Sequence, residues 1–279
     1  MSREIEVMAL FIAVVCLIVD AGARRLRRMR GYEVGDTLCS VLIGLSGLVA
    51  WTVARAAVLA VGVLITQHLP TLSLVPDDVA GWMLTLLGVD LGYYWYHRLL
   101  HRTNVGWAMH SVHHSSPCFN YATALRGSFA EPFVEPWFHV WLLLLGADPL
   151  EVVGAMTVNH LYQFCLHTES VGRLKWVGWL FVTPSEHRVH HASNNEYLDR
   201  NFGAMLSIWD HLFGSYTPEI VQPVYGLVKP IRSNSPLTVM MAPVAALVRN
   251  LQALRSLRAQ LSHLVARPDD PTTNMEYHL

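Results

Sequence analysis

Three histidine-rich stretches stand out in this sequence: His97-Arg-Leu-Leu-His101, His110-Ser-Val-His113-His114 and His187-Arg-Val-His190-His191. An α-helix brings side chains three and four positions apart onto one face, so the first stretch presents two imidazoles and each of the others presents three. A single His167 follows Gln163 by one helical turn. Nine imidazoles are too many for one metal ion, which takes about four ligands in a closed protein site. Because imidazole binds iron, zinc, copper and nickel, the sequence predicts a two-metal centre.

The candidate ligands are nine histidines and one glutamine, whose side-chain oxygen, or a water held by it, could complete a site: His97, His101, His110, His113, His114, His167, His187, His190, His191 and Gln163. In metal-bound imidazoles the second ring nitrogen commonly donates its N–H in a hydrogen bond to a carboxylate or carbonyl. The acids available for this are Asp90, Glu131, Glu135, Glu169, Glu186, Asp199 and Asp210. Among them we expect Asp90, Glu169 and Asp210 to orient ligands. Asp90 is favoured because it precedes His97 by two helical turns.

Two further histidines, His139 and His160, lie within apolar stretches. An ionisable side chain in such a place is a functional hint by default. Two readings are open for this pair: they orient metal ligands, or they are hydrogen-bonded core residues. The remaining histidines lie outside the clusters and are not predicted ligands: His68, His211, His263 and His278.

The composition is that of a membrane protein. Apolar residues make up 52% of the 279-residue chain and charged residues 15%, against about 25% charged residues in soluble domains. The net charge of −1 shows no excess of basic residues, which binding to nucleic acid would require. The four cysteines lie far apart without a Cys-x-x-Cys pair, so we interpret them as small buried apolar side chains.

Hydrophobic runs predict the spans and their orientation. The first run, Ile5–Val19, is followed by five arginines that mark its end as cytoplasmic: Arg24, Arg25, Arg27, Arg28 and Arg30. A basic block after the apolar run favours a retained helix over a signal peptide. Runs at Leu38–Ile65 and Val79–Tyr96 predict two more spans. The loop between them, Thr66–Asp78, contains no Lys or Arg, as expected on the outer side.

The same count places all four histidine clusters on the cytoplasmic face. The third run leads directly into His97 and ends in aromatic residues, which favour the membrane interface. Two apolar stretches, Phe133–Leu145 and Leu150–Leu166, flank a turn and predict a hairpin that returns the chain to the same side before His167. A hairpin that crosses and one that only dips into the membrane both fit, because the first stretch is short.

These observations predict an all-α fold: a multi-span membrane helical bundle with a cytoplasmic-side, histidine-rich helical cap. We divide it into N-terminal transmembrane helices (1–78), a catalytic domain (79–218) and a C-terminal amphipathic helix with a tail (219–279). Apolar residues recur at helical spacing over 244–265, with arginines among them. This helix either lies on anionic lipid or packs on the catalytic domain. A loose polar tail is expected from Arg267 onward.

The histidine stretches and the residues between them resemble the fatty acid hydroxylase/sterol desaturase superfamily of membrane di-iron oxygenases. The segments that carry the resemblance are Asp90–Arg102, Trp107–Phe129, Tyr162–Ser170 and Thr183–Thr217. Their sequence motifs, including YQFCLHTE, TPSEHRVHH and YLDRNFGAMLSIWDHLFGSY, are most similar to those of the alkylglycerol monooxygenase branch. Glu186 departs from that branch, which has a second histidine there, and Gln163 stands where some relatives have one.

The resemblance implies that the nine histidines hold two iron ions, with O2 as co-substrate. It implies an integral, multi-pass protein of the bacterial inner membrane or the endoplasmic reticulum, with its site facing the cytoplasm. The expected reaction is hydroxylation or desaturation of an aliphatic C–H bond of a lipid. An ether lipid of the alkylglycerol type is favoured, and a sterol or an ornithine-type aminolipid is the alternative. Electrons would come from a separate partner: tetrahydrobiopterin, or a donor of the ferredoxin or cytochrome b5 type.

Two rival classes are weighed against the enzyme. A histidine-rich membrane metal transporter or metal store would place ligands along a path at mid-membrane. A bis-histidine heme protein would not need adjacent histidine pairs. In this chain the histidines gather at span ends and in the polar segments that follow, which favours the enzyme.

Overall fold

The computed structural model describes residues 2–29 and 31–268, with side chains from Phe11 onward. Within these residues every regular element is helical, and the only β-type pairing is two isolated bridges, Phe181 with Leu206 and Ala192 with Tyr225. The all-helical class predicted from the sequence is confirmed. Arg30, His278 and most of the predicted polar tail (269–279) lie outside the described residues.

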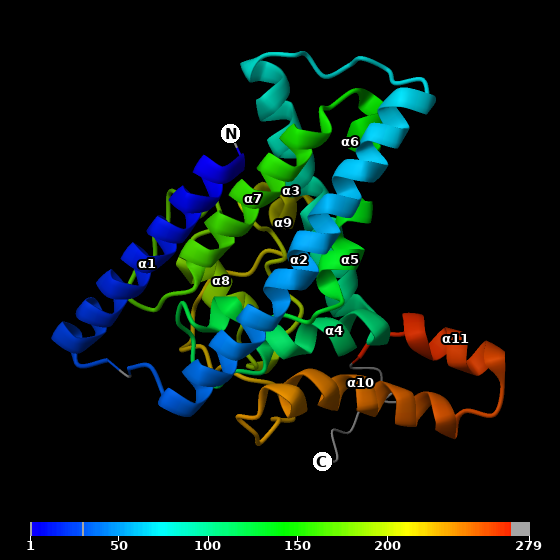
Figure 1. Cartoon of the computed structure of the whole chain (residues 1–279). Coiled ribbons are helices and arrows are strands. Elements are labelled where there is room, and N and C mark those ends of the chain that lie inside the picture. The colour runs from blue at the N-terminus through cyan, green and yellow to red at the C-terminus, as the bar shows by residue number, and fades with distance from the viewer. Residues whose placement is uncertain (1, 30, 269–279) are drawn as a thin grey trace.

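Four long helices form the upright part of the molecule: α1 (Ser2–Arg27), α2 (Val34–His68), α3 (Val79–Arg102) and α7 (Pro149–Leu166) (Figure 1). Helix α7 contacts each of the other three. The Asp148 carboxylate caps α7, and Pro149 occupies the first turn, where a missing N–H costs no helical hydrogen bond.

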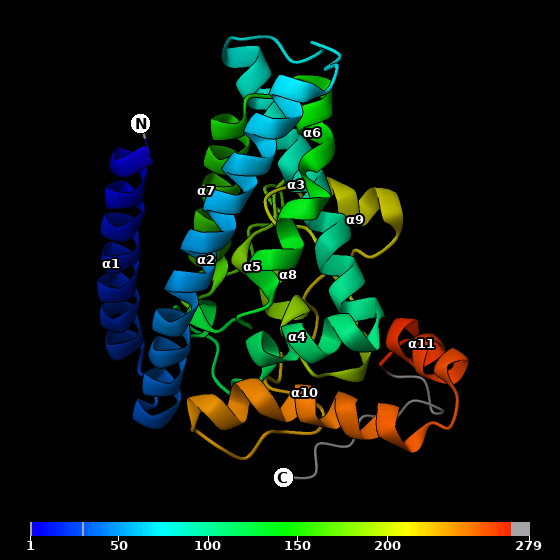
Figure 2. The same ribbon diagram turned by 45° about the vertical axis from the view of Figure 1, so that its right-hand side comes forward.

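Shorter helices lie below and beside the upright ones (Figure 2). Thr103 ends α3, and its hydroxyl caps α4 (Asn104–His114), so the chain turns sharply there. Gly106 allows this turn, because a Cβ at that position would lie 2.5 Å from the Cα of Leu100. Helix α8 (Pro184–His190) begins with a capping box formed by Thr183 and Glu186. The other short elements are η1 (Thr123–Leu125), η3 (Asn195–Tyr197) and α9 (Ile208–Phe213).

The apolar stretch 133–145 does not form one helix. It divides among α5 (Glu131–Val134), η2 (Glu135–Phe138) and α6 (Val140–Leu145). Pro132 and Pro136 lack the N–H that a continuous helix needs, so each restarts the chain in a new short helix. Gly146, with φ of 103°, ends α6 in the left-handed conformation. The first arm of the predicted hairpin is therefore a chain of short helices.

The C-terminal helical pattern also divides in two. Helix α10 (Pro236–Ala253) and helix α11 (Leu257–Val265) are separated at 254–256, and the Ser256 hydroxyl caps the second. Helix α10 contacts α2 and α4, and α11 contacts α4. Figure 2 shows α10 crossing beneath the upright helices and α11 lying to one side, next to α4. Val239 and Leu247 are buried in these contacts. The C-terminal helices therefore pack on the rest of the protein, which is the second of the two alternatives given above.

Among the described helices, α2 alone is long and apolar enough to cross a membrane, with a mean hydropathy of 2.2 over its most apolar 18 residues. Helices α3 and α7 do not meet that test, and the predicted span Ile5–Val19 includes residues whose side chains the structure does not describe. Helix α3 carries Asp90 together with the polar residues of its histidine end, which lowers its apolar content. The number of spans therefore stays a prediction.

A buried ion pair fastens the start of α2 to the end of α4. The Arg126 guanidinium lies 2.5 Å from Asp36 Oδ1 and donates to Ser40 Oγ and Ser115 Oγ at 2.8 Å each. The Arg126 and Asp36 side chains are both 2% exposed. Removing one partner of such a pair leaves the other charge buried without compensation.

Replacing this arginine tests the fastening. Arg126→Ala is expected to lower the free energy of unfolding by roughly 3–5 kcal/mol, because Asp36 stays buried and unpaired. Thermal unfolding of the detergent-solubilised protein measures the loss. The matched control is Arg258→Ala, at an exposed position of α11, which should change stability by less than about 0.5 kcal/mol. Equal melting of the two variants would contradict the role given to the ion pair.

Candidate metal centre

The nine clustered histidines come together in two groups. The first histidine group is His97, His101, His110, His114 and His190. The second histidine group is His113, His167, His187 and His191. Within each group one ligand nitrogen from every ring lies within 4.8 Å of the others, and eight of the nine residues are buried. The structure thus brings together all nine histidines that the sequence predicted as ligands.

Helical spacing decides which ring joins which group. His97 and His101 project from one face at the end of α3 into the first group. In α4, His110 and His114 are four residues apart and enter the first group, while His113 turns to the second. The third motif divides in the opposite sense, because His187 and His191 enter the second group and His190 enters the first. Each His-x-x-His-His motif therefore contributes to both groups.

Backbone carbonyls fix the orientation of four of these rings. The Nδ1 atoms lie within hydrogen-bond distance of carbonyl oxygens: His97 of Phe202 at 2.9 Å, His113 of Arg126 at 2.9 Å, His167 of Gln163 at 2.8 Å and His190 of Arg200 at 3.0 Å. A carbonyl oxygen can only accept, so Nδ1 carries the hydrogen in each case. In a neutral ring the other nitrogen, Nε2, is then a bare lone pair.

These lone pairs face one another inside the centre. His113 Nε2 lies 3.3 Å from His167 Nε2, and His97 Nε2 lies 3.0 Å from His110 Nε2. Four more Nε2 atoms are buried without a hydrogen-bond partner: those of His101, His114, His190 and His191. Unpaired buried acceptors cost free energy, and facing lone pairs repel. A cation among them removes both penalties, so the donor set fits metal ions.

Burial keeps the rings neutral. It lowers the pKa of His113 to about 4 and that of His190 to about 3, and it moves the pKa values of His101 and His191 in the same direction. At neutral pH these imidazoles are unprotonated. Neutral imidazole is the form that ligates metals, so burial prepares the centre for binding.

Glu131 is the carboxylate that contacts a clustered ring most closely. Its Oε2 lies 3.2 Å from His110 Nδ1 and accepts from the Tyr96 hydroxyl at 3.2 Å, while Ser128 N donates to Oε1 at 3.2 Å. Burial alone would raise the pKa of Glu131, but the neighbouring His110 and His113 lower it. The sequence offered Glu131 only as one acid among seven. No local signal sets it apart, because the contact joins α5 to α4 across the fold.

The three favoured acids contact other groups. Asp90 accepts from Met205 N, Leu206 N, Trp209 Nε1 and Asn159 Nδ2, so its expected direct contact with a ligand ring was wrong. Glu169 lies 3.3 Å from Arg24 Nη1 instead of reaching a ring. Asp210 accepts from Phe202 N at 2.7 Å and from Gly203 N at 2.9 Å. Asp210 therefore holds the backbone of Phe202, whose carbonyl accepts a hydrogen bond from His97, and its own hydrogen-bond partners among the described residues do not include a clustered ring.

Gln163 contributes its backbone to the centre. Its carbonyl receives His167 Nδ1, whereas its side-chain amide donates to Asn159 Oδ1 at 2.7 Å. His139 and His160 lie apart from both groups and flank the buried Glu135, whose Oε1 is 2.9 Å from His160 Nε2 and 3.6 Å from His139 Nε2. His211 stacks on Tyr216 at a ring-centroid distance of 4.0 Å.

The loop that follows α8 holds an unusual backbone. Asp199 and Asn201 have φ values of 58° and 54°, and Arg200 between them supplies the carbonyl that receives His190 Nδ1. Non-glycine residues seldom adopt this conformation, and asparagine and aspartate tolerate it best. The Asn201 side chain secures it by accepting from Thr217 N at 2.8 Å and donating to Thr217 O at 2.8 Å. Strain of this kind is typical of a functional site.

A cavity of about 250 Å³ opens beside the centre. Four clustered histidines line it: His101 of α3, His114 of α4, and His190 and His191 at the end of α8. Trp107 and the segment 226–229 also line it. Small molecules can therefore approach the imidazole nitrogens of both groups from one side.

Known proteins share the segment that carries these groups. A family model described as "Fatty acid hydroxylase" matches residues 82–215. The chain is 37% identical over 207 residues to an alkylglycerol monooxygenase of Xenopus tropicalis and 38% identical over 199 residues to one of Danio rerio, covering 74% and 71% of this chain. It is 32% identical over 138 residues, 48% of this chain, to an ornithine lipid hydroxylase of Rhizobium tropici.

The chain spans 46%, 44% and 41% of the lengths of these three relatives, respectively. It therefore matches about half of the two alkylglycerol enzymes. No solved structure matches the chain.

Removing one clustered ring tests the metal centre. His190→Ala is expected to lower the iron bound by the purified protein, because a ring that serves the first histidine group is lost. Elemental analysis of the protein loaded with ferrous iron gives the measurement. His211→Ala, at an exposed ring outside both groups, is the matched control and should keep the full iron content. Full loading of both variants would refute the assignment of His190.

Glu131→Gln tests the orienting carboxylate. The amide keeps the size of the side chain but removes its charge, and loss of such a partner typically lowers metal affinity by about 10–100-fold. Iron titration of the metal-free variant, followed by its absorbance, measures the change. Glu196→Gln, at an exposed position, should bind iron as the wild type does. Unchanged affinity in Glu131→Gln would show that the contact with His110 does not support the metal.

Proposed function

Because residues 82–215 match the fatty acid hydroxylase family model, we propose that the chain is a membrane-bound, non-heme di-iron oxygenase that acts on a C–H bond of a lipid. The observation that carries the proposal is the pair of histidine groups, in which eight of the nine rings are buried and ring nitrogens of both groups lack a hydrogen-bond partner within the described part of the chain. Relatives named as lipid monooxygenases and hydroxylases support the same class of reaction.

One iron would be held by the first histidine group and the other by the second. When bound, the two ions supply the reduction of O2 and the removal of a hydrogen atom from an aliphatic carbon. The protein's own part is to hold the rings. Carbonyl and carboxylate partners fix the tautomers, the buried surroundings keep the imidazoles neutral, and the surrounding side chains limit the access of water.

An ether lipid of the alkylglycerol type is the proposed substrate, since the two alkylglycerol monooxygenases cover most of this chain. Insertion of one oxygen atom of O2 into the C–H bond beside the ether oxygen gives a hemiacetal, and the other oxygen atom leaves as water. Two electrons and two protons come from the external donor. The hemiacetal then breaks its C–O bond to give an aldehyde and glycerol. The similarity to an ornithine lipid hydroxylase makes an aminolipid the second candidate substrate.

The donor is proposed to be a separate molecule, either tetrahydrobiopterin or an electron-transfer protein of the ferredoxin or cytochrome b5 type. The cavity beside the histidines supports approach from the aqueous side, because Asp199 and Lys229 are among its lining residues. A metal transporter is disfavoured, since the two groups are closed clusters at helix ends and the family is one of oxidoreductases.

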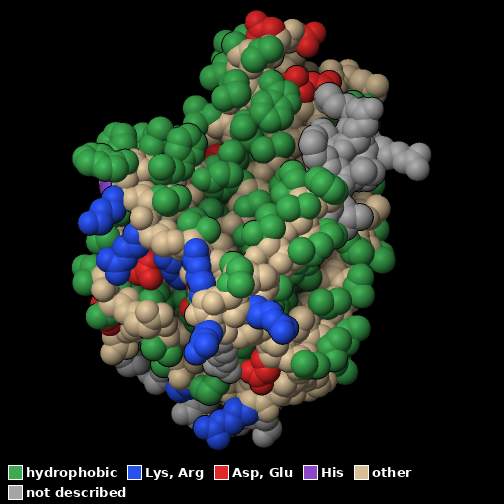
Figure 3. Space-filling view, turned by 90° about the vertical axis from the view of Figure 1, so that its left-hand side faces the viewer, with side chains coloured by type: hydrophobic (Ala, Val, Ile, Leu, Met, Phe, Trp, Pro, Cys, Tyr) green, Lys and Arg blue, Asp and Glu red, His purple; other side chains and the backbone are tan. Residues whose placement is uncertain are grey.

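The proposed topology is multi-pass with the centre facing the cytoplasm. Arg24, Arg25 and Arg27 lie in the last turn of α1, at the end where the histidine helices also lie. In Figure 3 the Lys and Arg side chains gather over the lower part of the molecule, whereas hydrophobic side chains cover the upper part. The loop at the top, between α2 and α3, carries Asp77 and Asp78 but no basic residue. This asymmetry is typical of a protein whose basic end stays in the cytoplasm.

Turnover of an ether lipid tests the proposal. Iron-loaded protein in phospholipid nanodiscs, given 1-O-hexadecylglycerol, O2 and reduced pterin or reduced ferredoxin, is expected to release hexadecanal with uptake of one O2 per aldehyde. His190→Ala should give neither product nor oxygen uptake. Hydroxylation of an ornithine lipid without aldehyde formation would replace the proposed substrate. Absence of oxygen uptake with either lipid and either donor would reject the oxygenase.

A further inference from the structure

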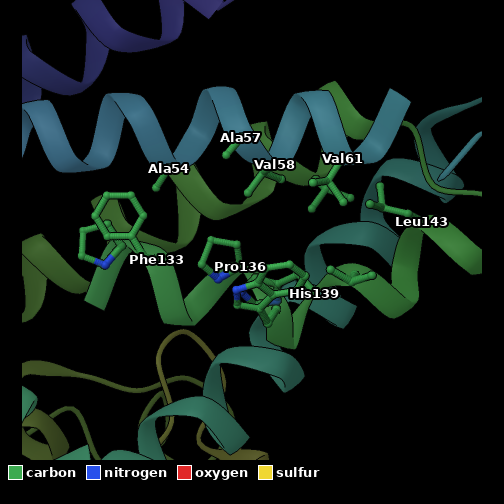
Figure 4. A pocket seen from close by; sticks show the side chains of 12 residues that line it. Ala54, Ala57, Val58, Val61, Phe133, Pro136, His139 and Leu143 are labelled. Atoms are coloured by element: carbon green, nitrogen blue, oxygen red, sulfur yellow. The ribbon is translucent and has the colours of Figure 1, made fainter. Parts of the chain in front are cut away.

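An apolar pocket of about 270 Å³ lies between α2 and the broken segment α5–η2–α6 (Figure 4). One wall is a single face of α2, where lining residues recur at positions i, i+3, i+4 and i+7: Ala54, Ala57, Val58 and Val61. The facing wall includes Phe133, Pro136, His139 and Leu143. The prolines that divide this segment into short helices also line the pocket, so the same break creates the space.

The lining of the pocket is suited to hydrocarbon. Nearly all of its surface comes from apolar atoms, so a water molecule inside would find few hydrogen-bond partners. His139 also lines the pocket; its Nε2 lies 3.6 Å from Glu135 Oε1, and neither of its ring nitrogens has a hydrogen-bond partner among the residues that the structure describes. Among the lining residues, Ala57 on α2 and Phe133 and Trp137 on the facing segment are exposed, so the pocket has its mouth between the facing segment and α2, the helix that can cross a membrane. In the proposed topology the pocket therefore opens toward lipid.

The pocket is also adjacent to the candidate metal centre. Pro132 lines it, and the preceding residue, Glu131, contacts His110 of the first histidine group at 3.2 Å. Rings also join α2 to α3 near the first histidine group: His160 lies between Trp51 of α2 and Tyr93 of α3, at centroid distances of 4.7 and 6.2 Å. Tyr93 in turn lies 5.3 Å from the ring of His97. Glu131 thus links the wall of the pocket to the first histidine group.

We propose that this pocket holds the hydrocarbon chain of the lipid substrate. The inference rests on the proposed function and adds the place where the chain binds. A chain held here keeps its apolar body against α2 and the α5–η2–α6 segment, and its polar end extends toward the cytoplasmic side where the histidines lie. Recognition is then by burial of methylene groups, without a directional contact, so affinity should rise with chain length.

Cross-linking tests the location without turnover. Metal-free protein in phosphatidylcholine nanodiscs is irradiated with a 1-O-alkylglycerol that carries a diazirine at the end of its chain, and labelled peptides are identified by mass spectrometry. Label is expected within 54–61 or 132–143 and should be displaced by excess unlabelled alkylglycerol. If a diazirine phosphatidylcholine labels the same peptides and alkylglycerol does not displace it, the pocket is a bilayer-lipid site and the proposal is overturned. Label elsewhere overturns it as well.

A bulky residue at the mouth tests the same point through specificity. Ala57→Trp should fill the pocket and reduce cross-linking about tenfold, the effect of losing the burial of roughly two methylene groups. Ala56→Trp is the matched control, because Ala56 is exposed on α2 and does not line the pocket. Equal labelling of the two variants would contradict the proposal, provided that both melt as the wild type does.

Kinetics separate this inference from the proposed function. In the wild type, KM for alkylglycerols should fall as the chain lengthens, and Ala57→Trp should lose that dependence while Ala56→Trp keeps it. An active wild type with the same chain-length dependence in Ala57→Trp overturns the pocket alone. A wild type that binds alkylglycerol in the pocket but never oxidises it overturns the proposed function alone.

Discussion

The unprotonated nitrogens of buried imidazoles face one another at the centre of this molecule, and only a cation makes that arrangement favourable. His113 and His167 bring two Nε2 atoms to 3.3 Å, while their Nδ1 atoms are directed outward to backbone carbonyls, and burial lowers the pKa of both rings. In a neutral ring with Nδ1 protonated, Nε2 cannot donate. The pair is thus repulsive as it stands and becomes attractive once a metal ion lies between the lone pairs.

Much of the surrounding structure serves to hold these rings. Arg126 acts twice, since its guanidinium pairs with Asp36 while its carbonyl receives His113. Asp210 acts through the backbone of Phe202, whose carbonyl receives His97. Because carbonyls and a carboxylate set the tautomers, the orientation of the imidazoles depends on main-chain geometry in loops that carry no histidine. Substitutions in those loops should therefore affect metal binding without altering a ligand.

The local part of this arrangement is visible in the sequence. Histidines three and four residues apart share a helix face, which is why the motifs predict convergent rings and why the all-helical class was foreseen. Contacts between distant segments are not visible in this way. Asp90 has the right helical spacing to His97, but its face of α3 meets the segment around Met205 and Leu206, whereas Glu131 reaches His110 from another helix. The breaks at Pro132 and Pro136 likewise required the structure, because apolar periodicity alone does not place them.

Anomalous scattering at the iron absorption edge, from crystals of the protein loaded with ferrous iron, tests the central claim most directly. The account predicts two peaks, one surrounded by rings of the first histidine group and the other by rings of the second. A single peak, peaks away from these rings, or the absence of any anomalous signal in enzyme that still consumes oxygen would contradict it.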